Sequence, residues 1–158
     1  MLGALLPMQL LGAAFPIAAG DTFFTKRATS IFATACMNAL PLWRKSCGGH
    51  SLEVLRERLL DGKAVYILFP EGTRTRTGEI AKFKAGVGHL VAGTDVPVVP
   101  CYIKGTFAAF PATATLPRIA PIQARIGSAL TFGSLLNERV GWTEVAASTE
   151  AAVRALAA

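Results

Sequence analysis

Residues 64–74 read AVYILFPEGTR, an apolar run that passes directly into a polar turn. The run 64–69 is continuously apolar and rich in β-branched and aromatic side chains, which is the pattern of a strand buried on both faces. Pro70 ends the strand, and residues 71–74 begin a loop. Because continuous apolar strands are typical of sheets that helices cover, this run predicts an α/β fold.

Segments with helical spacing alternate with apolar, strand-like segments on both sides of this run. Before it, leucines recur at helical spacing, with Ser51 as a suitable N-cap and Gly62 as a suitable C-terminal stop. After it, Pro97 and Pro100 place a strand at a sheet edge or a bulge, since proline cannot donate to a strand ladder. Helices are predicted over 28–40, 51–60, 85–93 and 143–156, and strands within 8–19, 64–69, 96–103 and 122–126. The alternation predicts a layered α/β domain, a mostly buried mixed sheet flanked by helices, that occupies residues 1–158 as a single domain.

The first twenty residues carry no charge, and three interpretations of them compete. A signal peptide needs a positive segment before its apolar stretch, but the first cation is Lys26. Pro7 and Pro16 would interrupt a membrane-spanning helix. We favour the third interpretation, in which residues 8–19 form a buried strand with its flanking turns inside a folded domain.

Positive charge is concentrated around the polar turn. The chain carries a formal charge of +6, and residues 44–84 hold nine basic and five acidic side chains. An excess of cations over one segment predicts an anionic partner near it. Few aromatic side chains are interleaved with the basic residues and no nucleic-acid motif is present, so a nucleic-acid partner is not expected.

The cysteines are Cys36, Cys47 and Cys101, and they are too widely spaced for a zinc or redox pair. We interpret them as small packing residues of a protein from a reducing compartment. They predict no metal site.

The loop at 71–74 has the chemistry of an anion site at the carboxyl end of a strand, where α/β sheets commonly bind ligands. Gly72 permits close approach of the backbone, Thr73 offers a hydroxyl, and Arg74 offers a planar fork that matches phosphate oxygens. Glu71 suits such a site if it pairs with an arginine or accepts a hydrogen bond from a substrate hydroxyl. The alternative is a Pro-Glu-Gly turn with a solvated arginine, and these residues alone leave both interpretations open.

Residues 69–74, FPEGTR, resemble the third sequence motif of the glycerolipid acyltransferases, the 1-acyl-sn-glycerol-3-phosphate (lysophosphatidate) acyltransferase group. Residues 38–44, NALPLWR, are similar to the family's second motif, an apolar stretch that ends in arginine. KFKAG at 82–86 and VPVVP at 96–100 are similar to the segments that follow in the family. The four segments occur in the family's order.

This resemblance implies a glycerol-3-phosphate acyltransferase-like fold. It also implies transfer of a fatty acyl group from acyl-CoA or acyl-carrier protein to the hydroxyl of lysophosphatidate or a related lysophospholipid, with no cofactor. In the family, the arginines of the second and third motifs hold the phosphate of the acceptor, so Arg44 and Arg74 are expected to do so here. Glu71, Gly72 and Thr73 would shape the pocket.

The general base of the family is a histidine separated by four residues from an aspartate. The chain has two histidines, His50 and His89, and neither has an aspartate at that spacing, so no catalytic residue is identifiable. GHSLE at 49–53 lacks the second glycine of a nucleophile elbow, and a serine hydrolase is therefore not expected. Residues 1–7, MLGALLP, resemble the stretch that follows the family's aspartate. We therefore expect that the chain begins just past its catalytic base and has little activity alone.

A second function is compatible with the same residues, namely a non-catalytic module, derived from such an enzyme, that binds anionic lipid or phosphate. Lys82 and Lys84 would form a rim that faces anionic lipid or the CoA phosphates, or simply a solvated face. Since substrate and product are lipids and no segment is a convincing span, we expect peripheral attachment to the cytoplasmic face of the cell membrane.

Overall fold

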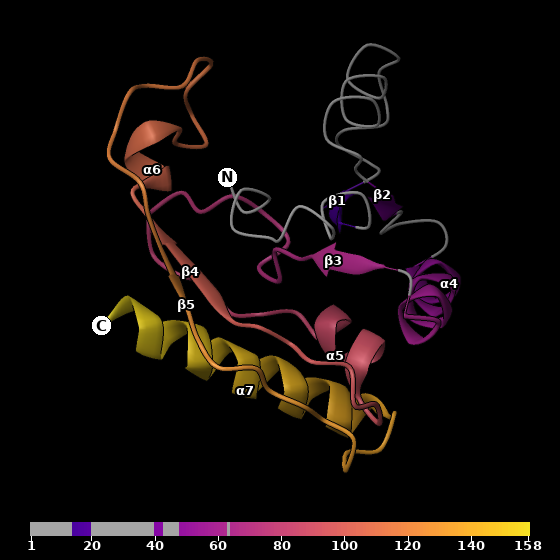
Figure 1. Cartoon of the computed structure of the whole chain (residues 1–158). Helices are drawn as coiled ribbons and strands as arrows, with labels where there is room; N and C mark the ends of the chain where they lie inside the picture. The colour runs from indigo at the N-terminus through magenta and orange to yellow at the C-terminus, as the bar shows by residue number, and fades with distance from the viewer. Residues whose placement is uncertain (1–13, 20–39, 43–47, 63) are drawn as a thin grey trace. The chain divides into compact units, whose positions relative to one another are not determined.

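The computed structural model describes residues 14–19, 40–42, 48–62 and 64–158. The chain divides into two compact units, Met1–Phe69 and Pro70–Ala158. In chain order the elements are β1 (Ala14–Ala19), β2 (Leu40–Leu42), α4 (Gly48–Leu60), β3 (Val65–Ile67), α5 (Gly86–Val91), β4 (Cys101–Lys104), α6 (Thr106–Ala109), β5 (Gln123–Ile126) and α7 (Arg139–Ala157) (Figure 1). Helices and strands are interspersed, and the predicted α/β class is confirmed. The extent of a single domain over 1–158 stays a prediction.

The first unit contains a three-stranded parallel sheet in the order β2-β1-β3. Ala14 of β1 pairs with Val65 of β3, and Ile17 of β1 pairs with Leu40 of β2. Parallel neighbours require long crossover connections, which the spacing of these strands along the chain provides.

Two sequence predictions concern this sheet. The internal strand predicted within 8–19 is confirmed for β1, while residues 8–13 lie outside the described residues. The helix predicted over 28–40 also lies outside them, except for Leu40, which begins β2 instead. An apolar run without clear periodicity suits a buried strand or a buried helix equally, so the sequence did not separate the two at this residue.

Helix α4 confirms the helix predicted over 51–60 but begins earlier, at Gly48. Ser51 therefore lies inside the helix, and its assignment as the N-cap was wrong, because leucine spacing marks the buried face of a helix and not its first turn. The stop was predicted correctly: Gly62 has a left-handed φ of +68°, and its N–H donates to the Leu59 carbonyl at 3.1 Å. Leu55 faces the interior, and its carbonyl accepts a 3.0 Å hydrogen bond from the Tyr66 hydroxyl of β3.

Strand β3 is shorter and less buried than its apolar sequence predicts. It spans three residues of the predicted 64–69, all of them half-buried, and Phe69 is 61% exposed. The expectation of burial on both faces was wrong because β3 is an edge strand, paired in the described residues with β1 alone. The apolar sequence predicts that a strand forms, but it does not predict whether the strand lies at the centre or at the edge of the sheet.

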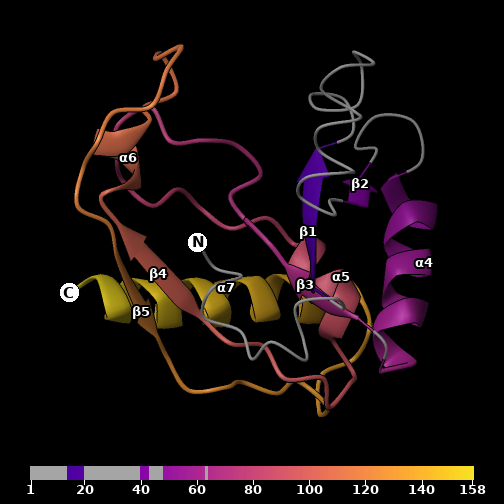
Figure 2. The same cartoon turned by 45° about the horizontal axis from the view of Figure 1, so that its top comes forward.

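The second unit is built on the long helix α7, which packs against α5 and against β4 (Figures 1 and 2). Strands β4 and β5 pair in antiparallel register, with Cys101 opposite Ile126. Leu90 of α5 and Val145 of α7 are fully buried between these elements. The two helices approach closely at Gly88, where any side chain would overlap the Trp142 carbonyl.

The helices predicted over 85–93 and 143–156 and the strand predicted within 122–126 are confirmed as α5, α7 and β5. The strand predicted over 96–103 is confirmed only in its last part, as β4, because Val98 makes just an isolated bridge to Leu130. Pro97 and Pro100 flank that bridge and lack the N–H that a continuous ladder needs, so the strand begins after them. Helix α6 had no counterpart in the sequence analysis.

An ion pair on α7 holds the segment that follows the FPEGTR motif. Glu150 Oε1 lies 2.8 Å from Arg154 Nε, one turn along the helix. Glu150 Oε2 accepts a hydrogen bond from the Phe83 backbone N–H at 2.9 Å. Arg154 Nη2 donates to the Ile80 carbonyl at 2.8 Å. Glu150 and Arg154, named here the α7 brace, therefore fix two points of the backbone that returns from the motif.

The α7 brace depends on the charge of Glu150. The Phe83 N–H, followed by the Arg154 guanidinium, lowers the pKa of the Glu150 carboxyl, and the charge of Lys82 adds to this effect. A carboxylate with a lowered pKa in the folded state stabilises the fold fully above its ordinary pKa. That stabilisation is lost as the pH falls through the lowered value.

Glu150→Gln should lower the free energy of unfolding by about 1 kcal/mol at neutral pH, because a neutral amide replaces a charge-assisted acceptor on the protein surface. Urea unfolding at several pH values measures the deficit, which should shrink once the pH drops below the ordinary glutamate pKa of 4.5 and the wild-type carboxyl protonates. Glu144→Gln, at an exposed position on the same helix, is the control and should have no such effect. A deficit that stays constant at acidic pH would contradict the role of the charge.

Candidate functional site

The motif lies in a loop whose two ends are joined. The Lys84 N–H donates to the Pro70 carbonyl at 2.9 Å, so residues 70–84 leave and return to the same point. This closure brings the second predicted lysine, Lys84, beside the start of the motif. Arg44, which was predicted to bind the phosphate together with Arg74, lies outside the described residues.

Glu71 is bound inside this loop. Its Oε2 accepts a hydrogen bond from the Ala81 backbone N–H at 2.8 Å, which joins the outgoing and returning segments of the loop. The sequence analysis considered an arginine or a substrate hydroxyl as its partner and did not foresee a backbone one. Through this oxygen, the carboxylate stabilises the conformation of the loop.

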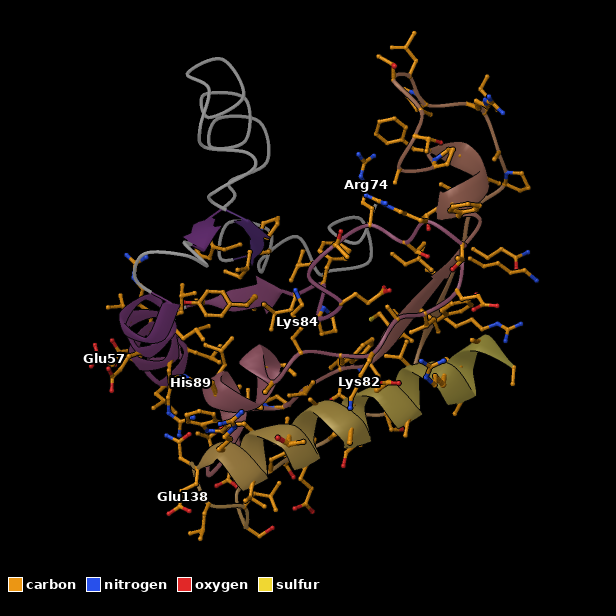
Figure 3. The ribbon with its side chains drawn as sticks, turned by 180° about the vertical axis from the view of Figure 1, so that it is seen from behind. Glu57, Arg74, Lys82, Lys84, His89 and Glu138 are labelled. Carbon is orange, nitrogen blue, oxygen red and sulfur yellow. The ribbon has the colours of Figure 1, made fainter. Side chains whose placement is uncertain are left out.

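Gly72 provides the space in which Lys84 lies. Its φ is +71°, a left-handed conformation that glycine adopts without strain. A Cβ at this position would stand 2.7 Å from Lys84 Nζ, so the lysine side chain crosses directly over the glycine. Lys84 thus lies against the motif, whereas Lys82 lies toward α7, where its charge acts on Glu150 (Figure 3). The rim assigned to these two lysines stays a prediction.

Arg74 is exposed and lies against an aromatic ring. Its guanidinium carbon is 5.0 Å from the centroid of the Phe110 ring, in cation–π contact. A ring over the face of a guanidinium restrains the side chain and leaves the in-plane N–H groups available to a ligand. Phe110 comes directly after α6 and belongs to none of the sequence motifs, which is why the sequence analysis missed it.

Arg74 is one of the residues that line a hollow of about 430 Å³ beside the loop. The lining residues are Thr73, Arg74, Thr75, Arg76, Thr77, Glu79, Ile80 and Ala81. The lining thus has two guanidinium groups and three hydroxyls but only one carboxylate, so the hollow suits an anion better than a cation. One hydroxyl is structural, because Thr75 Oγ1 accepts the Gly78 N–H at 3.0 Å and so shapes the turn.

Both histidines belong to helices. His50 is part of α4, and His89 is on α5, where its ring centroid is 4.5 Å from that of Trp142. Figure 3 shows His89 and Arg74 at opposite ends of the second unit. Within the described ranges, no group of three His, Cys, Asp or Glu side chains is placed to hold a metal ion. None of the helices in those ranges is long and apolar enough to cross a membrane.

Comparison with known proteins gives relatives of one kind. A 1-acyl-sn-glycerol-3-phosphate acyltransferase of Cocos nucifera is 35% identical over 74 residues, which are 47% of this chain and 24% of that protein. A chloroplastic 1-acyl-sn-glycerol-3-phosphate acyltransferase of Brassica napus is 35% identical over 81 residues, 48% of this chain and 22% of that protein. These matches therefore span about a quarter of the length of the curated relatives.

Among solved structures, the 1-acyl-sn-glycerophosphate acyltransferase PlsC of Thermotoga maritima matches with a TM-score of 0.66 and 21% identity, over 94% of this chain and 58% of that one. At this identity the match establishes a shared fold. The family model described as Acyltransferase matches residues 1–104, a range that contains the FPEGTR loop and the elements β1, β2, α4 and β3 before it. The chain belongs to the Acyltransferase family, in the group that resembles the 1-acyl-sn-glycerol-3-phosphate acyltransferases.

Proposed function

We propose that this chain takes part in the transfer of a fatty acyl group from acyl-CoA or acyl-carrier protein to the hydroxyl of lysophosphatidate or a related lysophospholipid, and that it binds the acceptor's phosphate. The observation that carries the proposal is the closed loop at 70–84, which brings Lys84 against Gly72 and presents Arg74 at a basic hollow. The family relationship supports the reaction class. The names of the relatives support the acceptor.

The two cations would act differently on a phosphate. Arg74 offers a planar fork for two oxygens, and the Phe110 ring restrains its orientation. Lys84 offers a compact charge directly over the backbone of the motif. A phosphate monoester carries a charge between about −1.5 and −2 near neutral pH, so two cations from one loop match it.

The other predicted residues complete this assignment. Thr73 would donate its hydroxyl at the rim of the hollow, and Glu71 would keep the loop in shape through Ala81. Arg44 would hold the same phosphate from the second motif, as the resemblance implies. Lys82 would assist only through Glu150, since its charge acts there.

A second function is supported by the excess of basic residues over 44–84 and by the uncharged first twenty residues. In this alternative the chain is a non-catalytic module that binds anionic lipid or phosphate at a membrane. Both functions place it, as a proposal, peripherally at the cytoplasmic face of the cell membrane, where acyl donors and lysophospholipids meet.

Arg74→Lys should weaken the binding of glycerol 3-phosphate about tenfold, and Arg74→Ala somewhat more, because the bidentate contact is lost and then the charge as well. Isothermal titration of the purified chain measures the affinity. Arg139→Ala removes an exposed arginine of α7 and should leave it unchanged. If Arg74→Lys binds glycerol 3-phosphate with wild-type affinity, a bidentate contact between Arg74 and the phosphate is ruled out.

Gly72→Ala should weaken glycerol 3-phosphate binding about fivefold, because the new methyl group displaces the Lys84 ammonium. Gly62→Ala is a matched control: Gly62 has a similar left-handed φ of +68°, but a Cβ there meets no atom within 4 Å. Both variants should lose about 1 kcal/mol of stability from the strained backbone, and only the first should lose affinity. Equal affinities in the two variants would remove Lys84 from the site.

Release of free CoA from acyl-CoA separates the catalytic from the non-catalytic function. If the chain is an enzyme, release should depend on lysophosphatidate, exceed the uncatalysed rate and disappear in Arg74→Ala. Absence of a general base would reduce the rate about 10²–10⁴-fold, so the assay needs high enzyme concentration and long incubation. Release that equals background while glycerol 3-phosphate still binds would favour the non-catalytic module.

A further inference from the structure

The segment from α6 to the following loop exposes several large apolar side chains. Leu116 is 76% exposed and Ile119 is fully exposed, while Phe107 and Phe110 are exposed by more than a third. Figures 1 and 2 show this segment projecting from the end of the β4-β5 pair, away from α7. We name residues 107–119 the α6 loop. Large apolar side chains grouped in one exposed segment favour an interaction site.

The α6 loop is closed and therefore ordered before it binds anything. The Arg118 N–H donates to the Ala109 carbonyl at 2.6 Å, and the Ala114 N–H donates to the Pro111 carbonyl at 3.0 Å. Pro111 and Pro117 fix further backbone angles. A closed loop of this kind is a compact Ω-type loop, and its preorganisation reduces the entropy lost on binding.

Contacts of the two phenylalanines tie the α6 loop to the loop that carries the FPEGTR motif. The Phe110 ring holds the Arg74 guanidinium, and the Phe107 ring packs over Gly78, where a Cβ would stand 3.1 Å from the ring. These rings are thus partly used inside the second unit. Leu116 and Ile119 remain as the apolar tips available to a partner.

The charge of the surrounding sequence is of one sign. Residues 96–137 contain no aspartate or glutamate and carry Lys104, Arg118 and Arg125. A second exposed apolar pair, Leu136 and Val140, lies instead among charges of both signs in the sequence, next to Glu138 and Arg139. Along this stretch of sequence the charged neighbours of Leu116 and Ile119 are all cations, which matches a surface that is apolar inside and anionic outside.

We propose that the α6 loop docks this protein on an anionic lipid bilayer, with Leu116 and Ile119 inserted among the acyl chains and Arg118 at the level of the lipid phosphates. This inference rests on the proposed function, because an acceptor with an acyl chain resides in a bilayer. The contacts of Phe107 and Phe110 then hold the Arg74 hollow close to the lipid surface. The docked loop and the phosphate site move as one piece.

Sedimentation with vesicles tests the docking. Vesicles of equimolar phosphatidylcholine and phosphatidylglycerol should bind the wild-type chain, and vesicles of phosphatidylcholine alone should bind it more weakly. The double variant Leu116→Ser/Ile119→Ser should bind the mixed vesicles about tenfold more weakly, since two inserted side chains are lost. Arg118→Ala should weaken this binding about fivefold, and that loss should vanish at high salt.

The matched control is Leu136→Ser/Val140→Ser, which removes an apolar pair of similar exposure and should keep wild-type vesicle binding. Unchanged vesicle binding in Leu116→Ser/Ile119→Ser, or equal loss in the control, overturns the docking by the α6 loop. A changed oligomeric state in that variant without a change in vesicle binding also overturns it, in favour of contact between copies of the chain.

Titration of the wild-type chain and of Arg74→Ala with soluble glycerol 3-phosphate separates this inference from the proposed function. If the affinity for glycerol 3-phosphate depends on Arg74 but vesicle binding is unchanged by substitutions in the α6 loop, only the docking proposal fails. If vesicle binding follows the α6 loop and no Arg74-dependent affinity is found, only the phosphate site fails.

Discussion

The candidate site depends on how α7 holds the backbone that returns from the motif. Glu150 binds the Phe83 N–H and Arg154 binds the Ile80 carbonyl, and the two side chains bind each other. These contacts restrain an exposed loop that would otherwise be more mobile. They add to the hydrogen bonds within the loop, from Lys84 to Pro70 and from Ala81 to Glu71. A surface ion pair, ordinarily a weak source of stability, here sets the geometry of a site.

An acidic residue in the proposed phosphate site is at first sight a contradiction, and the hydrogen bond from Ala81 to Glu71 resolves it. Glu71 Oε2 is occupied by the Ala81 N–H, so part of its charge is offset by a backbone dipole within the loop. The cations, in contrast, are presented on the surface of the loop by Gly72 and by the Phe110 ring. Glu71 therefore acts within the loop, whereas Lys84 and Arg74 present their charges on its surface. This division of roles explains how residues of opposite charge can serve one anion.

The sequence predicted those parts of the fold that depend on local pattern. Spacing of apolar residues located α4, α5 and α7, a continuous apolar run located β3, and Gly62 ended α4 as its left-handed φ requires. The start of α4 and the burial of β3 were wrong, because both depend on neighbours that the local pattern does not contain. Two prolines warned of an interrupted strand before β4, and the structure confirms that interruption.

Of the site, the sequence predicted the residues of the motif but not their partners. Phe110 contacts Arg74 through its ring face, and Ala81 and Glu150 take part in hydrogen bonds between a side chain and a backbone N–H. Such contacts leave no spacing signal. Long sequence separation has the same effect, since the contacts of the α7 brace join residues 67 and 74 positions apart. Similarity to relatives identifies the family, and the physical contacts identify what holds the motif in place.

The separation between the motif and its brace also has a consequence for biosynthesis. The FPEGTR residues leave the ribosome well before α7 does, and at about 5–20 residues per second the interval lasts several seconds. During that interval the loop lacks both contacts that α7 supplies to Ile80 and Phe83. Until α7 has been synthesised, the backbone at Ile80 and Phe83 lacks the braced geometry on which the proposed phosphate site depends.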